Sequence, residues 1–174
     1  MSTSEQDRQR AKGKNYAYRL LHDRPRSRRE LRERLARKGF DEATIDLVLA
    51  DLTKAGQIDD AKFARFLVES RMHMNPVGDV ILKHQLKAKG VSEEIIAGAL
   101  EEKAASYDEY ELALAMARER FERLKKLDRR KATKRVYDFM VRRGFNFDTI
   151  RRVIEEIVKG QGARDKGQGL DEGE

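Results

Sequence analysis

One short phrase occurs three times along the chain and limits what the chain can fold into. Each copy has two apolar residues four positions apart, followed by a basic residue and a glycine. The glycines are Gly39, Gly90 and Gly144, which lie 51 and 54 residues apart. A repeat of about this period indicates tandem structural units, which present a long surface and seldom a single catalytic pocket.

Each copy of the phrase predicts the end of one helix and the start of another. Apolar residues four apart share one face of a helix, and a basic side chain suits the negative end of the helix dipole. Glycine then takes the left-handed conformation that closes a helix. The residues Asp41, Ser92 and Asn146, which come two positions after the glycines, are good N-caps for the next helix.

Apolar residues recur at helical spacing after each glycine. The stripe has four members in the first and third repeats, whereas Lys103 takes the fourth position in the second repeat. The members are Ile45, Val48, Leu49 and Leu52, then Ile96, Ala99 and Leu100, then Ile150, Val153, Ile154 and Ile157. A further apolar stripe precedes each phrase, so each repeat is predicted to hold three amphipathic helices.

These patterns predict an all-α protein, a tandem array of three three-helix repeats that is elongated and curved. We expect the repeats at residues 15–55, 56–106 and 107–159. Residues 1–14 are polar, and residues 160–174 combine five glycines with mixed charge. Both terminal segments are therefore predicted to be disordered.

The composition excludes several classes of protein. There is no cysteine, which excludes disulfides and thiolate chemistry. No apolar run resembles a signal peptide or approaches the roughly 20 residues that span a bilayer. We therefore expect a cytoplasmic protein without a membrane partner.

The net charge of +7 is the sum of alternating blocks. Residues 24–38 carry eight basic and two acidic side chains, and residues 118–135 carry ten basic and three acidic ones. Residues 41–60 and 93–111 are acidic, with six and seven carboxylates and one basic residue each. Such blocks indicate either surfaces for a polyanion or an acidic protein, or solvated helix faces that neutralise their neighbours.

Two basic clusters are the candidate binding residues for a protein partner or DNA. The first lacks obvious local partners and contains Arg24, Arg26, Arg28 and Arg32. The second is denser and spans a predicted helix end, a turn and the next helix start. It contains Arg123, Lys125, Lys126, Arg129, Arg130, Lys131, Lys134 and Arg135. Ten cations in residues 118–135 exceed what helix dipoles require, which favours a contact role for this cluster.

No catalytic constellation stands out. His22, His73 and His84 do not have metal-ligand spacing with a carboxylate pair. Asp59 and Asp60 are explained by helix capping. There is neither a phosphate-binding glycine loop nor a serine in a nucleophile elbow. We therefore expect no enzyme activity, no cofactor and no metal.

The segments that carry the repeat resemble the RecX family of bacterial recombinase regulators. The resemblance lies in residues 31–41, 45–49 and 56–64, and again in residues 142–150, and it covers roughly residues 15–158. The second repeat departs from the family's Gly-Phe-Asp form, since Val91 and Ser92 follow its glycine.

The resemblance implies a small helical-repeat protein that binds RecA, chiefly its filament on single-stranded DNA. Family members lie in the filament groove and restrain RecA ATPase, strand exchange and coprotease activity, in DNA repair, homologous recombination and the SOS response. The resemblance also implies a non-enzymatic monomer that contacts single-stranded DNA directly or through the filament. The alternative is a sequence-nonspecific nucleic-acid-binding helical module without a dedicated protein target.

Overall fold

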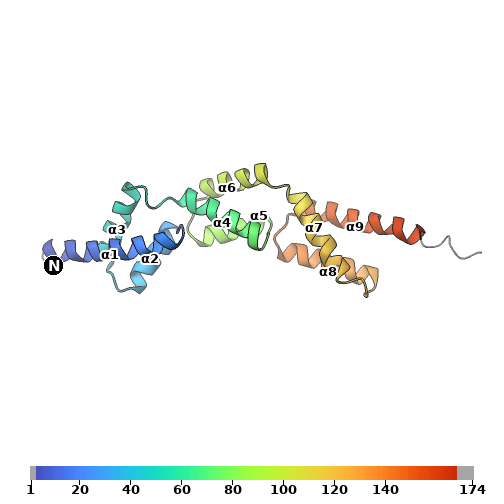
Figure 1. The fold of residues 1–174 in the computed structure, drawn as a ribbon, viewed down its shortest axis with the longest axis horizontal. Coiled ribbons are helices and arrows are strands. Elements are labelled where there is room, and N and C mark those ends of the chain that lie inside the picture. Colours follow the sequence, from blue (N-terminus) through green and yellow to red (C-terminus); the bar gives the residue numbers. More distant parts are fainter. Residues whose placement is uncertain (1–2, 168–174) are drawn as a thin grey trace, which may run out of the picture. The chain divides into compact units, whose positions relative to one another are not determined.

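The computed structural model describes residues 3–167, with the side chains of residues 4–159. Within this part the chain forms nine α-helices and no strand, which confirms the all-α prediction (Figure 1). The helices are α1 (Thr3–Asp23), α2 (Arg28–Arg37), α3 (Glu42–Lys54), α4 (Asp60–Met74), α5 (Asp79–Ala88), α6 (Glu93–Ser106), α7 (Glu109–Glu122), α8 (Arg129–Arg142) and α9 (Phe147–Gly167). No helix in the described part has an apolar stretch long enough to cross a membrane.

The first and third repeats each have a core of their own. Helices α1, α2 and α3 pack against one another, as do α7, α8 and α9 (Figure 1). The first core contains Leu31 and Leu35 from the phrase together with the complete stripe of α3. The third core contains Val136 and Met140 from the phrase with Ile150, Val153 and Ile157 of α9. The predicted stripes therefore face inward.

Contacts divide the chain into two compact units, which are described separately below. One unit combines the residues up to Ser70 with Lys83–Glu101. The other combines Arg71–Leu82 with the described residues from Glu102 onward. The second repeat thus contributes residues to both units.

The glycine of each phrase ends a helix, as predicted. Gly39, Gly90 and Gly144 have φ of 94°, 77° and 76°, the left-handed region that side chains with a Cβ disfavour. The predicted N-caps are also confirmed. Asp41 accepts the Thr44 N–H at 2.7 Å, Ser92 the Ile95 N–H at 3.4 Å, and Asn146 the Thr149 N–H at 2.8 Å.

Two of these glycine turns also receive the start of a helix from the preceding repeat. In the first unit, the Ser27 hydroxyl at the start of α2 donates to the Lys89 carbonyl at 2.8 Å. A Cβ on Gly90 would lie 2.9 Å from the Cβ of Arg29. The turn before α3 has no such neighbour, since a Cβ on Gly39 would meet nothing within 4 Å.

The second unit has an equivalent joint, in which the start of α5 packs on the glycine turn before α9. The distances at this joint are shorter. Gly78, which like Ser27 lies twelve positions before its phrase glycine, donates its N–H to the Arg143 carbonyl at 2.9 Å. The Val80 N–H donates to the Gly144 carbonyl at 3.2 Å. A Cβ on Gly144 would lie 2.4 Å from Cγ1 of Ile81, and one on Gly78 would lie 2.1 Å from the Gly144 oxygen. The glycine phrase is therefore both a helix end and a docking surface between repeats.

Helix α1 begins earlier than the sequence predicts. It is helical from Thr3, which corrects the predicted disorder of residues 1–14 over residues 3–14. Two contacts with α3 explain the difference. Arg10 donates to the Asp51 carboxylate at 2.7 Å, and Gly13 is buried where a Cβ would lie 2.9 Å from Val48. This first part of α1 packs on α3 through Arg10 and Gly13, although it has no apolar stripe of its own.

Helix α9 ends later than predicted. It continues to Gly167, through the first eight residues of the segment expected to be disordered. Once a packed face has nucleated a helix, each further residue adds a backbone hydrogen bond. Residues 168–174 of that expected tail lie outside the described residues.

The joint generates a prediction about two alanine variants. Each variant forces a Cβ into left-handed backbone, at a cost of roughly 1 kcal/mol. Gly144→Ala also forces that Cβ against Ile81, so we expect it to lose about 1–3 kcal/mol more than Gly39→Ala, the matched control. Urea unfolding followed by circular dichroism measures both losses. Equal losses would show that the joint tolerates a methyl group.

Candidate protein or nucleic-acid interface

The first predicted cluster of arginines is held by its own chain. Arg24 donates to the Glu30 carboxylate at 3.1 and 3.2 Å, and Arg26 is buried and donates to the Leu20 carbonyl at 2.9 Å. Arg28 donates to the Thr53 hydroxyl at 2.8 Å. Arg32 pairs with two carboxylates of α3, those of Glu42 and Asp46. The structure therefore gives all four arginines intramolecular partners that the spacing did not reveal.

Glu30 is the centre of this arrangement. Its side chain is nearly buried and also accepts from Lys89 of the second repeat at 2.8 Å. Burial disfavours the charged carboxylate, but the hydrogen bonds from Arg24 and Lys89 outweigh burial and lower the pKa of Glu30 to about 2. Of this cluster, Arg24 thus stabilises the joint beside Gly90 through Glu30.

The second predicted cluster is exposed throughout. It begins at the end of α7, continues through the turn and occupies the first two turns of α8. Its members are Arg123, Lys125, Lys126, Arg129, Arg130, Lys131, Lys134 and Arg135. Glu119 pairs with Arg123 and Asp138 with Lys134, while Arg129 donates to the Val158 carbonyl.

The remaining five cations of this cluster have no carboxylate partner among the described side chains. They are Lys125, Lys126, Arg130, Lys131 and Arg135. The structure brings them together on one end of the third repeat, with an Asp128 N-cap that accepts from the Lys131 N–H at 3.2 Å. We define these five residues, with Arg129 and Lys134, as the α8 basic patch. Its charge is available to an anionic partner.

An open cleft of about 560 Å³ borders the α8 basic patch. Its walls come from α8 and α9, with cations at the edge and apolar side chains between them. The lining residues are Arg129, Arg130, Thr133, Lys134, Tyr137, Ile154 and Val158. We name this cleft the α8–α9 groove. Sequence reasoning missed it, because Ile154 belongs to the core stripe and Tyr137, between Val136 and Asp138, is not part of any sequence pattern.

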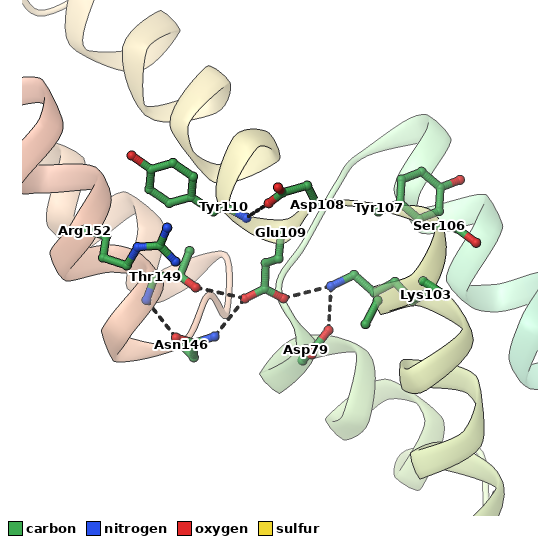
Figure 2. Close-up of a pocket in the computed structure, with 12 residues that line it drawn as sticks. Asp79, Lys103, Ser106, Tyr107, Asp108, Glu109, Tyr110, Asn146, Thr149 and Arg152 are labelled. Atoms are coloured by element: carbon green, nitrogen blue, oxygen red, sulfur yellow. Dashed lines mark hydrogen bonds and ion pairs between the residues drawn. The ribbon is translucent and has the colours of Figure 1, made fainter.

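A second, more polar cavity of about 590 Å³ lies in the second unit beside Lys103 (Figure 2). Lys103 is buried, with 2% of its side chain exposed, and bonds Asp79 at 2.6 Å and Glu109 at 2.8 Å. Glu109 in turn accepts from Asn146 at 3.0 Å. Figure 2 shows Glu109 between the ammonium group and the N-cap of α9.

This network explains why a lysine interrupts the apolar stripe of α6. Burial disfavours the ammonium ion, but the bonds to Asp79 and Glu109 outweigh burial and raise the pKa of Lys103. The polar groups at this cavity largely satisfy one another, so we regard Lys103 as a structural link among α5, α6 and α7. Among the described residues no cluster of histidine and carboxylate side chains could hold a metal ion.

Comparisons with known proteins agree with the division into three repeats. The chain matches the models of the first, second and third three-helix domains of RecX at residues 14–52, 59–100 and 107–154. It is 38% identical to the regulatory protein RecX of Chlorobium phaeobacteroides, over 82% of this chain and 91% of that protein. It is 35% identical to the RecX of Amycolatopsis mediterranei, over 87% of this chain and 86% of that one.

Two solved structures have the same fold. The crystal structure of RecX from Lactobacillus salivarius superimposes with a TM-score of 0.75 at 24% identity, and covers 86% of this chain and 97% of its own. A second crystal structure of a regulatory protein RecX gives 0.79 at 22% identity, over 87% of this chain and 74% of its own.

The lowered pKa of Glu30 predicts how stability depends on pH. The carboxylate is more acidic in the folded protein (pKa about 2) than in the unfolded chain (4.5), so its stabilisation is present above pH 4.5 and is lost as the pH falls toward 2. After allowance for solvent screening this is on the order of 1–2 kcal/mol. Glu30→Gln should therefore be less stable than the parent at pH 7 and equal to it near pH 2. A difference that does not change with pH in urea unfolding would contradict this role.

The buried lysine generates a second prediction. Lys103→Met keeps the apolar stem but leaves Asp79 and Glu109 without their cation, so we expect a loss of about 1–3 kcal/mol in unfolding free energy. Adding Glu109→Gln should cost less in this background than in the parent, because the pair is already broken. Lys87→Met is the control, since Lys87 pairs with Glu93 at 2.7 Å on the exposed surface and should hardly matter. Additive losses at positions 103 and 109 would contradict the network.

Proposed function

The chain belongs to the RecX family, and on that premise we propose that it is a regulatory protein that binds RecA and its filament on single-stranded DNA. In this proposal it inhibits RecA ATPase, strand exchange and coprotease activity by binding alone, as a cytoplasmic monomer without a cofactor.

The observation that carries the proposal is the α8 basic patch. Five of its seven cations face solvent without a carboxylate partner among the described side chains. An exposed cation that pairs with nothing contributes little to the fold, and its field attracts an anionic surface. The four arginines of the first cluster support the fold instead, so we propose that they contribute less to binding than the patch.

Repetition suits a filament as the target. A chain with three similar modules can make several weak contacts with neighbouring subunits, and linked contacts raise the affinity for a filament over that for a free subunit. We propose that the α8 basic patch meets acidic protein surface or the DNA backbone within the filament.

The same patch also supports the alternative of a nucleic-acid-binding module without a protein target. Phosphate contacts release counterions, so log K for single-stranded DNA alone should then fall with log salt by about 0.7 for each phosphate contact. A steep slope on DNA alone, together with no effect of the chain on RecA, would favour this alternative.

The proposal predicts the effect of a triple variant on RecA. Arg130, Lys131 and Arg135 are exposed, so replacing all three by alanine should leave the helical content and the unfolding midpoint unchanged. We expect about tenfold weaker inhibition of the ATPase of RecA on single-stranded DNA, because the patch loses most of its free charge. The measurement is the ATPase rate against the concentration of added chain.

The control removes the same charge elsewhere. Lys12, Lys54 and Lys62 are exposed residues of the first unit, and their triple alanine variant should inhibit like the parent. If the parent itself leaves RecA ATPase unchanged and does not bind the filament, the proposed function is wrong. If both triple variants lose inhibition equally, only the net charge matters and the patch is not the contact.

A further inference from the structure

The third repeat differs from the other two at one pair of equivalent positions. Seven positions before and three positions after the phrase glycine, the first repeat has Arg32 and Glu42, and the second has Lys83 and Glu93. Both pairs form ion pairs across neighbouring helices; that of Lys83 and Glu93 measures 3.0 Å. In the third repeat the same positions hold Tyr137 and Phe147. Two exposed aromatic side chains thus replace an ion pair.

The exchange extends to the adjoining positions. Lys87, which also pairs with Glu93, corresponds to Val141, and Asp46, which also pairs with Arg32, corresponds to Arg151. The exposed fractions are 38% for Tyr137, 50% for Val141 and 66% for Phe147. At these four positions the third repeat therefore has no carboxylate, a single cation and three exposed apolar side chains.

These residues extend the α8–α9 groove into an apolar strip. Along α8, Arg130, Lys134, Tyr137 and Val141 lie at helical spacing, and along α9 Phe147, Arg151, Ile154 and Val158 do the same. Each series of twelve residues is about 16 Å long, or three turns of helix. Four of the seven large apolar side chains that are exposed in the described part belong to these two helices. Such a concentration of exposed apolar surface marks an interaction site.

From this arrangement we infer that the α8–α9 groove binds an acidic amphipathic helix of a protein partner. The apolar side of that helix packs on Tyr137, Ile154 and Val158, and its carboxylates face the cations at the edge. Arg130 has no carboxylate partner among the described side chains, and Arg129, held by the Val158 carbonyl, has further N–H donors. The inference rests on the proposed function in that the partner is a protein bound through this repeat.

The chemistry of the floor favours a peptide over single-stranded DNA. Bases bind to surfaces on which they stack, and stacking needs aromatic rings or guanidinium planes in series. The floor has a single aromatic ring, Tyr137, beside the aliphatic Ile154 and Val158, and of the two lining guanidinium groups that of Arg129 is held by the Val158 carbonyl. Aliphatic grooves of this kind accept the leucine, isoleucine or phenylalanine side chains of an amphipathic helix.

The repeats themselves supply the variant that tests this inference. Tyr137→Arg combined with Phe147→Glu copies the ion pair of the first repeat, keeps the net charge and removes the apolar surface. Because the first repeat folds with this pair, the double variant is expected to retain its thermal unfolding midpoint. Tyr18→Arg is the matched control, since Tyr18 is 40% exposed in the first unit. Arg130→Glu tests the charge separately.

The probe is a fluorescent 16-residue designed peptide, with leucines on one face and glutamates on the other. Fluorescence anisotropy with the full chain should show at least tenfold tighter binding than for a peptide of the same composition in scrambled order. The double variant and Arg130→Glu should each weaken binding at least fivefold, and Tyr18→Arg less than twofold.

Several results would overturn the inference. They are equal binding of the scrambled peptide, full peptide binding by the double variant, or variants that lose binding of an oligo-dT probe but keep binding of the peptide. The last result would make the groove a nucleic-acid site. The proposed function is tested separately by RecA ATPase. Peptide binding without any effect on RecA would refute that function and keep the groove, whereas the reverse result would refute the groove alone.

Discussion

The packing of a helix N-terminus onto the glycine turn of the next repeat is the constraint on which the rest of the structure depends. Gly90 and Gly144 must both adopt positive φ and leave room for Arg29 or Ile81, where a Cβ would collide. A Cβ on Gly39 would meet nothing within 4 Å, so only the positive φ requires a glycine there. Because each joint involves neighbouring repeats alone, the fold is assembled from local contacts, as in other repeat proteins.

This constraint also determines how the charged residues are used. Near the joint beside Gly90, Glu30 is nearly buried and needs two cations to remain ionised, so Arg24 and Lys89 are bound there. Among the side chains that the structure describes, no comparable buried carboxylate lies beside the α8 basic patch, and the cations of the patch remain exposed. Two blocks of similar local charge therefore differ in how their cations are paired, and burial of the carboxylate partner distinguishes them.

Sequence reasoning could predict the features that depend on neighbouring residues. Glycine turns, N-caps and apolar stripes each involve groups within about one helical turn, and these predictions are confirmed at Gly144, Asn146 and Ile150. It could not predict that Lys103 reaches Asp79, 24 residues earlier, or that Glu30 reaches Lys89, 59 residues later. The first pair depends on how helices pack within a repeat and the second on how two repeats dock, and the spacing of residues along the sequence reveals neither contact.

The joint and the outer faces of the helices tolerate substitution very differently. A methyl group at Gly144 would collide with the backbone of Ile81, whereas an exposed ion pair such as Lys83 with Glu93 adds little to stability. Replacing such a pair by Tyr137 and Phe147 therefore changes the surface chemistry of a repeat at small cost to its fold. A fixed joint with variable outer faces allows three similar modules to present three different surfaces. This also accounts for a shared fold at only 22–24% identity with the solved structures.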